Sequence, residues 1–390
     1  MEKHGKTILG IVTIMYWFSL YTYVPYIAPY MGILGSSATL AGLVVGSYGF
    51  AQVILRIPVG ITADMLSRQK IFVILGVAFN SIASFCMWLI PGPYAMLVGR
   101  FLSGVAASMW VCYTTLYSSY YEKGETTKAL GNINALNNFG KFTASMLGGM
   151  VAQQFGITAP FALSFIIAGI AVILSLFVTD IKVDREPLKF IEIIKVGKDK
   201  TLLFSCILSS LAQMIIFATA FSFISNLAKE KNASDLELGI IATLFTFGML
   251  VASFMAGRGI IAKIGEKRAL MIGFITIGLY CVIAPFVPNV FALYILQFLG
   301  GCGNGLLFTL IMSMAVKKID PAKRSTAMGF YQAIYGIGMT IGPAIMGVLV
   351  DYTGFTMSFI SMGGISIIAM LMILFLYNRY VGAYNGEAAQ

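Results

Sequence analysis

The stretch "ALGNINALNNFGKFTASMLGGMVAQQFG", residues 129–156, lies without a gap over "AMGFYQAIYGIGMTIGPAIMGVLVDYTG", residues 327–354, when the chain is shifted by 198 residues. Small residues at equal spacing match: Ala129, Gly131, Ala135, Gly140, Gly149 and Gly156 lie over Ala327, Gly329, Ala333, Gly338, Gly347 and Gly354. A nearly equal shift places "RFLSG" (100–104) over "QFLGG" (297–301). A shift that recurs in this way indicates two related halves.

The composition assigns both halves to a lipid bilayer. Of the residues, 58% are hydrophobic and only 11% are charged, whereas about 25% are charged in a soluble domain. Twelve apolar stretches follow one another along the chain, each close to the roughly 20 residues that a membrane-spanning helix needs. Because the repeat shift covers six of them, an even number, the sequence predicts two parallel six-helix halves with the same orientation.

The longest interval between apolar stretches is "DIKVDREPLKFIEIIKVGKDK", residues 180–200. We therefore expect an N-terminal six-helix half over residues 1–180, a cytoplasmic linker over residues 181–201 and a C-terminal six-helix half over residues 202–390.

The net charge of +10 is distributed unevenly between the predicted loops. Of the 26 Lys and Arg residues, 21 fall in the N-terminus, the even-numbered loops and the C-terminus, while Lys229 and Lys231 alone fall in the opposite loops. Arg56, Arg100 and Lys141 lie inside spans. This positive-inside pattern predicts that both termini are cytoplasmic. The basic charge is then a topology signal, and no nucleic-acid partner is expected.

The sequence predicts no enzyme activity and no cofactor. The five cysteines fall inside predicted spans without paired spacing, which is typical of neither a disulfide framework nor a metal site. We also find no nucleophile–base pair, and no ATPase signature or phosphate-binding loop in a fitting context.

Three motifs carry a family resemblance. "GITADMLSRQK" (60–70) resembles the loop 2–3 signature of the major facilitator superfamily, in which Gly60, Asp64, Arg68 and Lys70 fill the expected places and Ser67 replaces a usual glycine. "RFLSGVAA" (100–107) resembles the fourth-helix arginine motif. "GKFTASMLGG" (140–149) resembles the fifth-helix antiporter motif, although its Gly-Pro pair is found only in the second half, as Gly342 and Pro343.

The resemblance implies an all-α integral membrane protein with the twelve-helix major facilitator fold, most similar to the drug-exporter branch. It further implies a monomeric, multi-pass transporter of small molecules in a bacterial inner membrane, where the lipid bilayer surrounds it.

The resemblance also implies a gate on the cytoplasmic side. Gly60 would allow a neighbouring helix to pack closely, and the Asp64 carboxylate would meet the N-terminus of the eleventh helix near Ser325, where the helix dipole favours an anion. Lys263 occupies the equivalent position in the second half, so only one latch of this polarity is expected. The alternative is that Asp64 merely belongs to a positive-inside loop. The predicted gating residues are Gly60, Asp64, Arg68, Lys70, Gly342 and Pro343.

A polar stripe in the predicted fifth span marks the candidate substrate site. Asn134, Asn137, Asn138 and Lys141 fall within roughly a third of a helix circumference. With Arg100, Gln52 and Tyr23 in the first half and Gln213, Asn304 and Gln332 in the second, they predict a central cavity lined by aromatic and amide groups. Asparagines and aromatics also stabilise helix packing, and a lysine can snorkel, so a structural role stays open for each.

All sixteen Asp and Glu residues fall in loops, tails or span ends. A transporter of organic cations would be expected to place a carboxylate in its cavity, whereas this chain places Lys141 there. We therefore expect a secondary active transporter, an exporter or antiporter of small organic or amphiphilic solutes that are anionic, zwitterionic or neutral, working by alternating access. Coupling to a proton or a counter-anion stays open. The alternatives are an importer or exchanger of small organic anions, and a lipid flippase.

Overall fold

The computed structural model describes residues 2–122, 125–181, 196–320 and 323–381, and every regular element within these ranges is helical. The first half contains α1 (Glu2–Thr22), the short helix η1 (Val24–Tyr26), α2 (Ile27–Ile33), α3 (Ala38–Leu66), α4 (Gln69–Leu89), α5 (Pro93–Ser108), α6 (Trp110–Ser119), α7 (Thr126–Phe155) and α8 (Ala159–Ser175).

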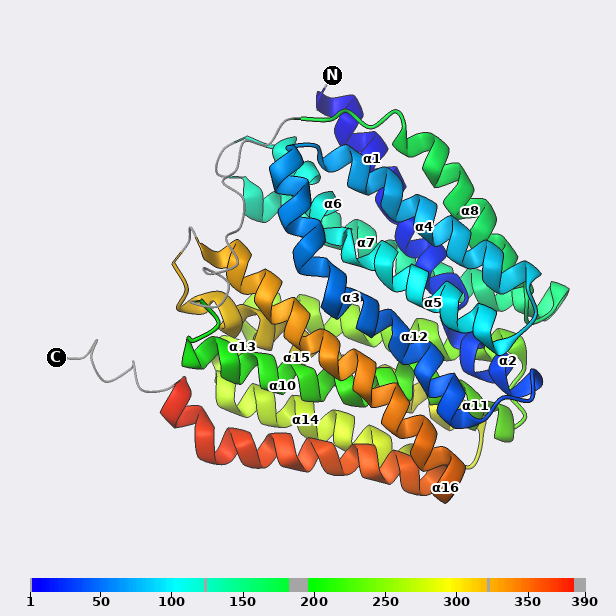
Figure 1. Cartoon of the computed structure of the whole chain (residues 1–390). Helices are drawn as coiled ribbons and strands as arrows, with labels where there is room; N and C mark the ends of the chain where they lie inside the picture. The colour runs from blue at the N-terminus through cyan, green and yellow to red at the C-terminus, as the bar shows by residue number, and fades with distance from the viewer. Residues whose placement is uncertain (1, 123–124, 182–195, 321–322, 382–390) are drawn as a thin grey trace.

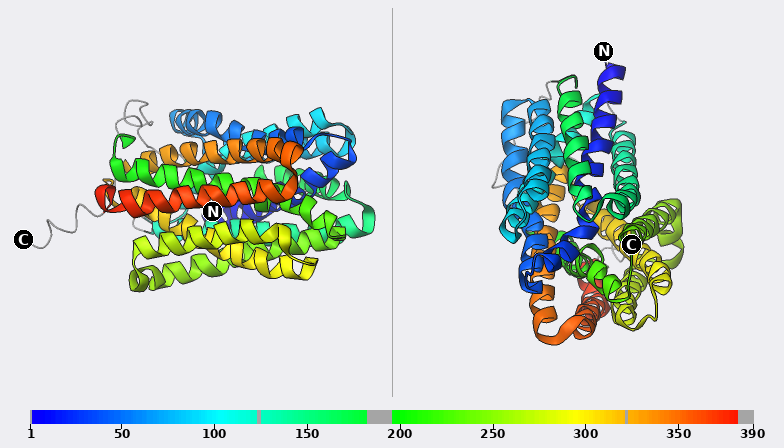
Figure 2. Two further views of the ribbon diagram at one scale, coloured as in Figure 1. Left: turned by 90° about the horizontal axis from the view of Figure 1, so that it is seen from below. Right: turned by 90° about the vertical axis from the view of Figure 1, so that its right-hand side faces the viewer.

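The second half contains α10 (Lys200–Ala218), η2 (Thr219–Phe223), α11 (Ile224–Glu230), α12 (Asp235–Met255), η3 (Ala256–Ile260), α13 (Ile261–Ile264), α14 (Glu266–Ile283), η4 (Ala284–Phe286), α15 (Val290–Lys317) and α16 (Arg324–Tyr380). Figure 1 shows the two groups of helices packed beside each other, and Figure 2 shows the same packing from two further sides. Most of the predicted linker, residues 182–195, lies outside the described residues, so the domain boundaries stay a prediction.

The helices have the length and composition of membrane spans. Within the described ranges nine helices are long and apolar enough to cross a bilayer. The longest of them, α16, consists of two helices joined at Gly354, where φ is 74° and the chain turns back (Figure 1). The helix α8 is apolar but shorter, and α7, which carries the polar stripe, is not among the nine. The all-helical membrane fold is confirmed, while the count of twelve spans stays a prediction.

Large apolar side chains cover the outside of the bundle. On α14, Ile272, Ile275 and Leu279 form one face and are 46%, 43% and 53% exposed. A soluble protein rarely leaves such a continuous apolar surface in water, and in a bilayer this face contacts lipid.

Residues that are equivalent in the sequence repeat make equivalent packing contacts between the halves. A methyl group placed on Gly347 would lie 2.3 Å from the carbonyl oxygen of Ala38, and one placed on Gly149 would lie 3.0 Å from that of Leu236. The members of these two contacts are related by the shift of 198 residues. Both halves therefore use the same small residue to approach the start of a helix in the other half.

The α3–α16 seam is tight toward the end of the bundle that carries α2 and α11. Methyl groups on Gly42 and Gly46 would lie 2.1 Å and 2.5 Å from the carbonyl oxygens of Pro343 and Thr340. Toward the other end, in α7 and α16, methyl groups on Gly131 and Gly329 would meet no atom of the described chain within 4 Å. The protein is thus closed at the α2/α11 end, which the charge pattern predicts to face outside.

The first apolar span of each half is interrupted within its length, at η1 in His4–Ile33 and at η2 in Lys200–Glu230. Pro25 lies in the 3-10 turn η1, as its helix-breaking character leads one to expect. The equivalent segment of the second half, η2, is a π-helix without proline. Irregular backbone at membrane depth is tolerated where it lines a cavity, and both segments do so.

Candidate substrate site

A small cavity of about 10 Å³, roughly the space of one water molecule, lies between the two halves. Its walls come from α1 and η1, from α7, from η2 and α11, and from α12. The lining residues are Tyr21, Val24, Pro25, Ser145, Ala220, Phe221, Ile224, Ser225, Ile241, Ala242 and Thr246. Two aromatic residues and several hydroxyl groups lie among mostly aliphatic side chains, and none of the predicted substrate ligands is among the lining residues. The assignment of those residues to the substrate site stays a prediction.

Lys141 lies directly beside this cavity, one turn of α7 before Ser145 and half-buried. Its Nζ lies 4.1 Å from the centroid of the Trp17 ring and 4.8 Å from that of Tyr21, both on α1. In the described part of the chain no carboxylate oxygen comes within 4.0 Å of this Nζ. The ammonium group is therefore stabilised by aromatic faces and not by an ion pair.

The three asparagines of the stripe have different surroundings. Asn134 is exposed, and its Nδ2 donates to the carbonyl oxygen of Leu130 in the same helix at 2.9 Å. Asn137 is buried, and its Oδ1 has no donor among the described residues. Asn138 is half-buried. Of the three, Asn137 has the unsatisfied polar atom that a ligand or a water molecule would complete.

Arg56 joins the halves through neutral groups. From α3, its Nη1 donates to Gln332 Oε1 at 2.9 Å and to the Tyr335 hydroxyl at 3.2 Å, both on α16. Its Nη2 donates to Gln52 Oε1 and, at 3.4 Å, to the carbonyl oxygen of Ala107. Gln52 and Gln332, two predicted substrate ligands, are thus brought together by this arginine, which connects α3 to α16.

Arg100 is 2% exposed and lies within the first half. Its guanidinium carbon is 4.2 Å from the centroid of the Tyr48 ring and 5.9 Å from that of Tyr23. Its Nε and Nη1 have no acceptor in the described chain. The Tyr23 hydroxyl is paired with Ser103 Oγ at 2.7 Å, and this fully buried tyrosine is not among the residues that line the cavity.

Two predicted ligands in the second half lie in helix contacts. Asn304, on α15, is 2% exposed, and its Nδ2 donates to Met249 Sδ on α12 at 3.4 Å. Gln213, on α10, is 6% exposed. Neither is among the residues that line the cavity between the halves.

The last turns of α3 and the short connection to α4 hold the predicted cytoplasmic gate. Asp64 Oδ1 accepts from Gln69 Nε2 at 3.3 Å. Ser325, its predicted partner, falls outside the residues whose side chains the structure describes, so the latch stays a prediction. Gly60 is buried, and a methyl group there would lie 3.9 Å from Val111 Cγ1, an ordinary van der Waals distance, so its role in gating stays a prediction.

Other members of this segment have local roles. Ser67, in the place of the family glycine, has the left-handed φ of 49°, which explains why glycine is usual there. Lys70 Nζ donates to the carbonyl oxygen of Leu176 at 2.7 Å and so ties the start of α4 to the end of α8. Arg68 immediately precedes α4 and is exposed.

The Gly-Pro pair of the second half lies at two helix contacts. A methyl group on Gly342 would lie 2.2 Å from the carbonyl oxygen of Met214 on α10, and the Pro343 carbonyl faces Gly42 on α3. These residues let α16 pack closely on both neighbours, which is compatible with a hinge or gate at this point.

The sequence did not reveal two helix caps that join the halves at the closed end. Asp351, on α16, accepts hydrogen bonds from the backbone N–H groups of Ala38 and Thr39 at 2.9 Å and 2.8 Å and from Thr39 Oγ1 at 2.6 Å. It therefore caps the N-terminus of α3 in the other half. Gln153, on α7, caps α12 in the same way, since its Oε1 accepts from the N–H of Leu236 at 3.3 Å.

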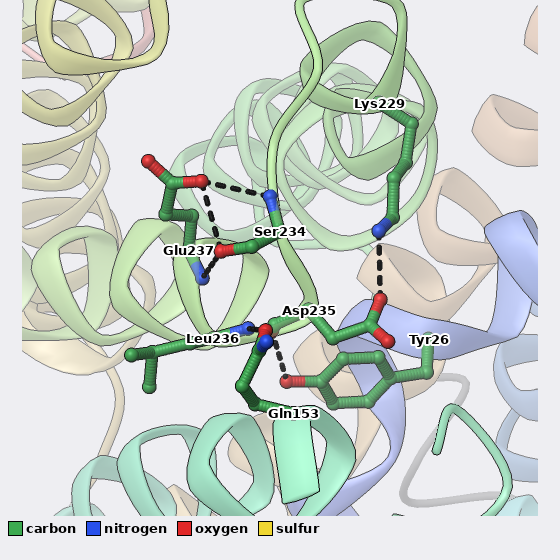
Figure 3. A network of polar contacts seen from close by, with 7 residues as sticks. All are labelled: Tyr26, Gln153, Lys229, Ser234, Asp235, Leu236 and Glu237. Carbon is green, nitrogen blue, oxygen red and sulfur yellow. Dashed lines mark hydrogen bonds and ion pairs between the residues drawn. The ribbon is translucent and has the colours of Figure 1, made fainter.

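The α12 cap belongs to a larger polar network at the closed end. Figure 3 shows Gln153 beside Tyr26, whose hydroxyl donates to the Asp235 carbonyl oxygen at 3.1 Å. The Asp235 carboxylate in turn lies 2.7 Å from Lys229 Nζ. Asp351 and Gln153 are exact partners under the 198-residue shift, as are Ala38 and Leu236. That equivalence was the available signal for the two caps.

Comparison with known proteins identifies the family. The Major Facilitator Superfamily profile matches residues 9–226 and 202–388. The multi-drug resistance efflux pump PmrA of Streptococcus pneumoniae is 26% identical over 325 residues, which cover 78% of each chain. The bacillibactin exporter of Bacillus subtilis is 24% identical over 353 residues, which cover 85% of this chain and 86% of the exporter.

A crystal structure of the nucleoside transporter NupG superimposes with a TM-score of 0.81 at 17% identity, covering 96% of this chain and all of NupG. At that identity the superposition speaks for the fold alone. The profile matches both halves of the chain, and the helices, their interrupted first members and the repeated contacts agree with it. The chain belongs to the Major Facilitator Superfamily and is a transporter of that type.

Proposed function

We propose that this transporter exports small organic or amphiphilic solutes that are anionic, zwitterionic or neutral, by alternating access. The observation that carries the proposal is the Lys141 ammonium beside the cavity, with two aromatic neighbours and, among the described residues, no carboxylate within ion-pair distance. A positive charge at membrane depth without a protein counter-charge favours a cargo that supplies one.

Trp17, whose ring the Lys141 ammonium contacts, carries a second donor. The indole Nε1–H of Trp17 is buried and has no acceptor in the part of the chain that the structure describes. A carboxylate or phosphate accepts hydrogen bonds from an ammonium and an N–H at the same time. Export as the direction is supported by two relatives whose names describe an efflux pump and an exporter.

Import or exchange of small organic anions is the second candidate. The Lys141 ammonium and its aromatic neighbours favour it as well, because they fit an anion that moves in either direction. Both candidates use the same cavity, so transport direction in proteoliposomes of known orientation separates them.

The test of the cargo class is a binding screen with three compounds of one shape. Benzoate, benzamide and benzamidinium with the same para tert-butyl group are anionic, neutral and cationic, and each is added to the purified protein in a thermal-shift assay. We expect the anion to stabilise the wild type most. Lys141→Gln should weaken anion binding by roughly tenfold, the value of one charge-assisted contact.

Lys128→Gln is the matched control, because Lys128 lies on the same helix but is exposed and paired with Glu125 at 2.8 Å. It should bind the anion like the wild type. Stabilisation by the cation that is indifferent to Lys141→Gln would contradict the proposal and make Lys141 a structural residue.

A further inference from the structure

The surroundings of Lys141 have the geometry of a binding site for organic cations. Its Nζ lies 4.1 Å from the centroid of Trp17 and 4.8 Å from that of Tyr21. Both distances are inside the limit of about 6 Å for attraction between a cation and an aromatic face. Proteins recognise quaternary ammonium groups with such aromatic cages. Here the cage, Trp17 and Tyr21, is occupied by the protein's own ammonium group.

Other aromatic residues hold the cage in place. Trp17 is 5% exposed, and its ring packs edge-on against Trp110, with 5.1 Å between centroids, and against Tyr16 at 5.5 Å. Tyr21 packs edge-on against Phe221 at 6.0 Å, across the boundary between the halves. Because these contacts do not involve Lys141, the two ring faces should persist when the ammonium is removed.

We infer that Lys141 determines specificity by occupying the aromatic cage and so excluding organic cations from the cargo. The inference deepens the proposed function and rests on it. A diffusible cation would have to displace a tethered one or lie beside it, and like charges a few ångströms apart repel strongly where water is scarce. Among the described residues no carboxylate within 4.0 Å of Nζ compensates a second positive charge.

The other half of the chain provides the substitution for the test. Under the 198-residue shift Lys141 corresponds to Met339, which is buried at 4% exposure. An unbranched apolar side chain is therefore accommodated at the equivalent position of a related helix. Methionine also adapts its shape to irregular gaps. Lys141→Met removes the charge and leaves both rings in place.

The experiment compares a cation with its neutral isostere. The probes are para-hydroxyphenyltrimethylammonium and para-tert-butylphenol, which have the same shape and differ in one positive charge. Binding to purified protein is followed by tryptophan fluorescence and by thermal shift. We expect Lys141→Met to bind the cation at least about tenfold more tightly than the wild type. The affinity for the neutral phenol should change much less, and this also reports that the variant is folded.

Further variants show which side chains prevent cation binding in the wild type and which provide it in Lys141→Met. Lys141→Arg keeps the positive charge and should exclude the cation as the wild type does. In the Lys141→Met background, Trp17→Leu should abolish the gain, whereas Trp17→Phe should keep part of it because an aromatic face remains.

Three results would overturn the inference: wild type that already binds the cation well, Lys141→Met that gains no affinity for it, and a gain that survives Trp17→Leu. Its failure is distinguishable from failure of the proposed function, which is decided by anion binding in Lys141→Gln. Gained cation affinity without any anion binding by the wild type would support the cage and overturn the anionic cargo.

Discussion

Ser67 ends α3 with a φ of 49°, in the left-handed region that costs a residue with a side chain about 1 kcal/mol or more. Its backbone N–H reaches the Asp64 carbonyl oxygen at 3.1 Å, so the turn is held in place despite this cost. We expect Ser67→Gly to raise the free energy of unfolding by about 1 kcal/mol, visible as a higher Tm in detergent.

Ser37 provides a control of opposite sign. It has a φ of −62°, and its Oγ caps α3 by accepting from the N–H of Leu40 at 3.2 Å. Ser37→Ala should lower the stability by about 1 kcal/mol. A Ser67→Gly variant that melts below the wild type would show that the left-handed turn carries no strain.

At this scale the sequence predicted residue types better than residue partners. Lys141 and the tyrosine-rich first span follow from composition and helical spacing, but none of the predicted amide ligands is among the residues that line the cavity. The contact of Lys141 with Trp17 depends on how α1 and α7 are rotated against each other, which spacing within one helix does not determine. For the same reason Gln52 and Gln332 were predicted as ligands without Arg56 as their shared partner.

The α3–α16 seam depends on glycines that have no room for a side chain. A methyl group on Gly46 would lie 2.5 Å from the Thr340 carbonyl oxygen. Gly46→Ala should therefore push the two helices apart at the closed end and destabilise that conformation by about 1–3 kcal/mol. Spin labels at Ile33 and Tyr352, both exposed and on opposite halves, would report a longer distance in a variant without the natural cysteines.

Gly329→Ala is the matched control, since a methyl group there meets no described atom within 4 Å. It should leave the distance between the labels unchanged. Equal distances in the Gly46→Ala variant and the wild type would mean that α3 and α16 accommodate the methyl group without separating.

The cap on α3 also predicts a shift between conformations. An anion at a helix N-terminus contributes about 1 kcal/mol in a favourable geometry, which is a roughly fivefold change in an equilibrium. Asp351→Asn keeps an acceptor oxygen but removes the charge, so the fraction of open molecules in the same label experiment should rise about fivefold. Gln153→Ala removes one neutral bond and should have the smaller effect. A larger effect of Gln153→Ala would contradict this ranking.

Elements were predictable where the sequence carries a local mark. Pro25 marks the interruption at η1, and the repeated small residues mark the helices that meet. The interruption at η2 has no proline, so only its position in the sequence repeat, equivalent to that of η1, predicts it. Asp351 reads as a loop carboxylate, because its function depends on a helix start more than 300 residues earlier in the chain.

In the whole molecule, α3 and α16 contact each other from opposite halves. The structure shows Asp351 capping the start of α3, and the family resemblance predicts that Asp64 caps the start of α16 at the other end. Alternating access requires that one of these ends opens while the other stays closed. We expect Asp64→Asn to abolish most transport in proteoliposomes while the amount of protein in the membrane stays normal.

Glu125→Gln is the control, because Glu125 is another acidic residue predicted on the cytoplasmic side and pairs only with exposed Lys128 among the described residues. It should transport like the wild type. Normal transport by Asp64→Asn would contradict the latch and leave Asp64 as an ordinary loop residue.

The two caps at the closed end are equivalent in position but unequal in strength. Asp351 is an anion with three donors, whereas Gln153 is a neutral amide with one. The Gln153 cap on α12 should therefore break before the Asp351 cap on α3. The two halves would then separate first along α7 and α12 and rotate about the α3–α16 contact. A solute leaving the cavity would pass first between α7 and α12, along the helix that carries Lys141.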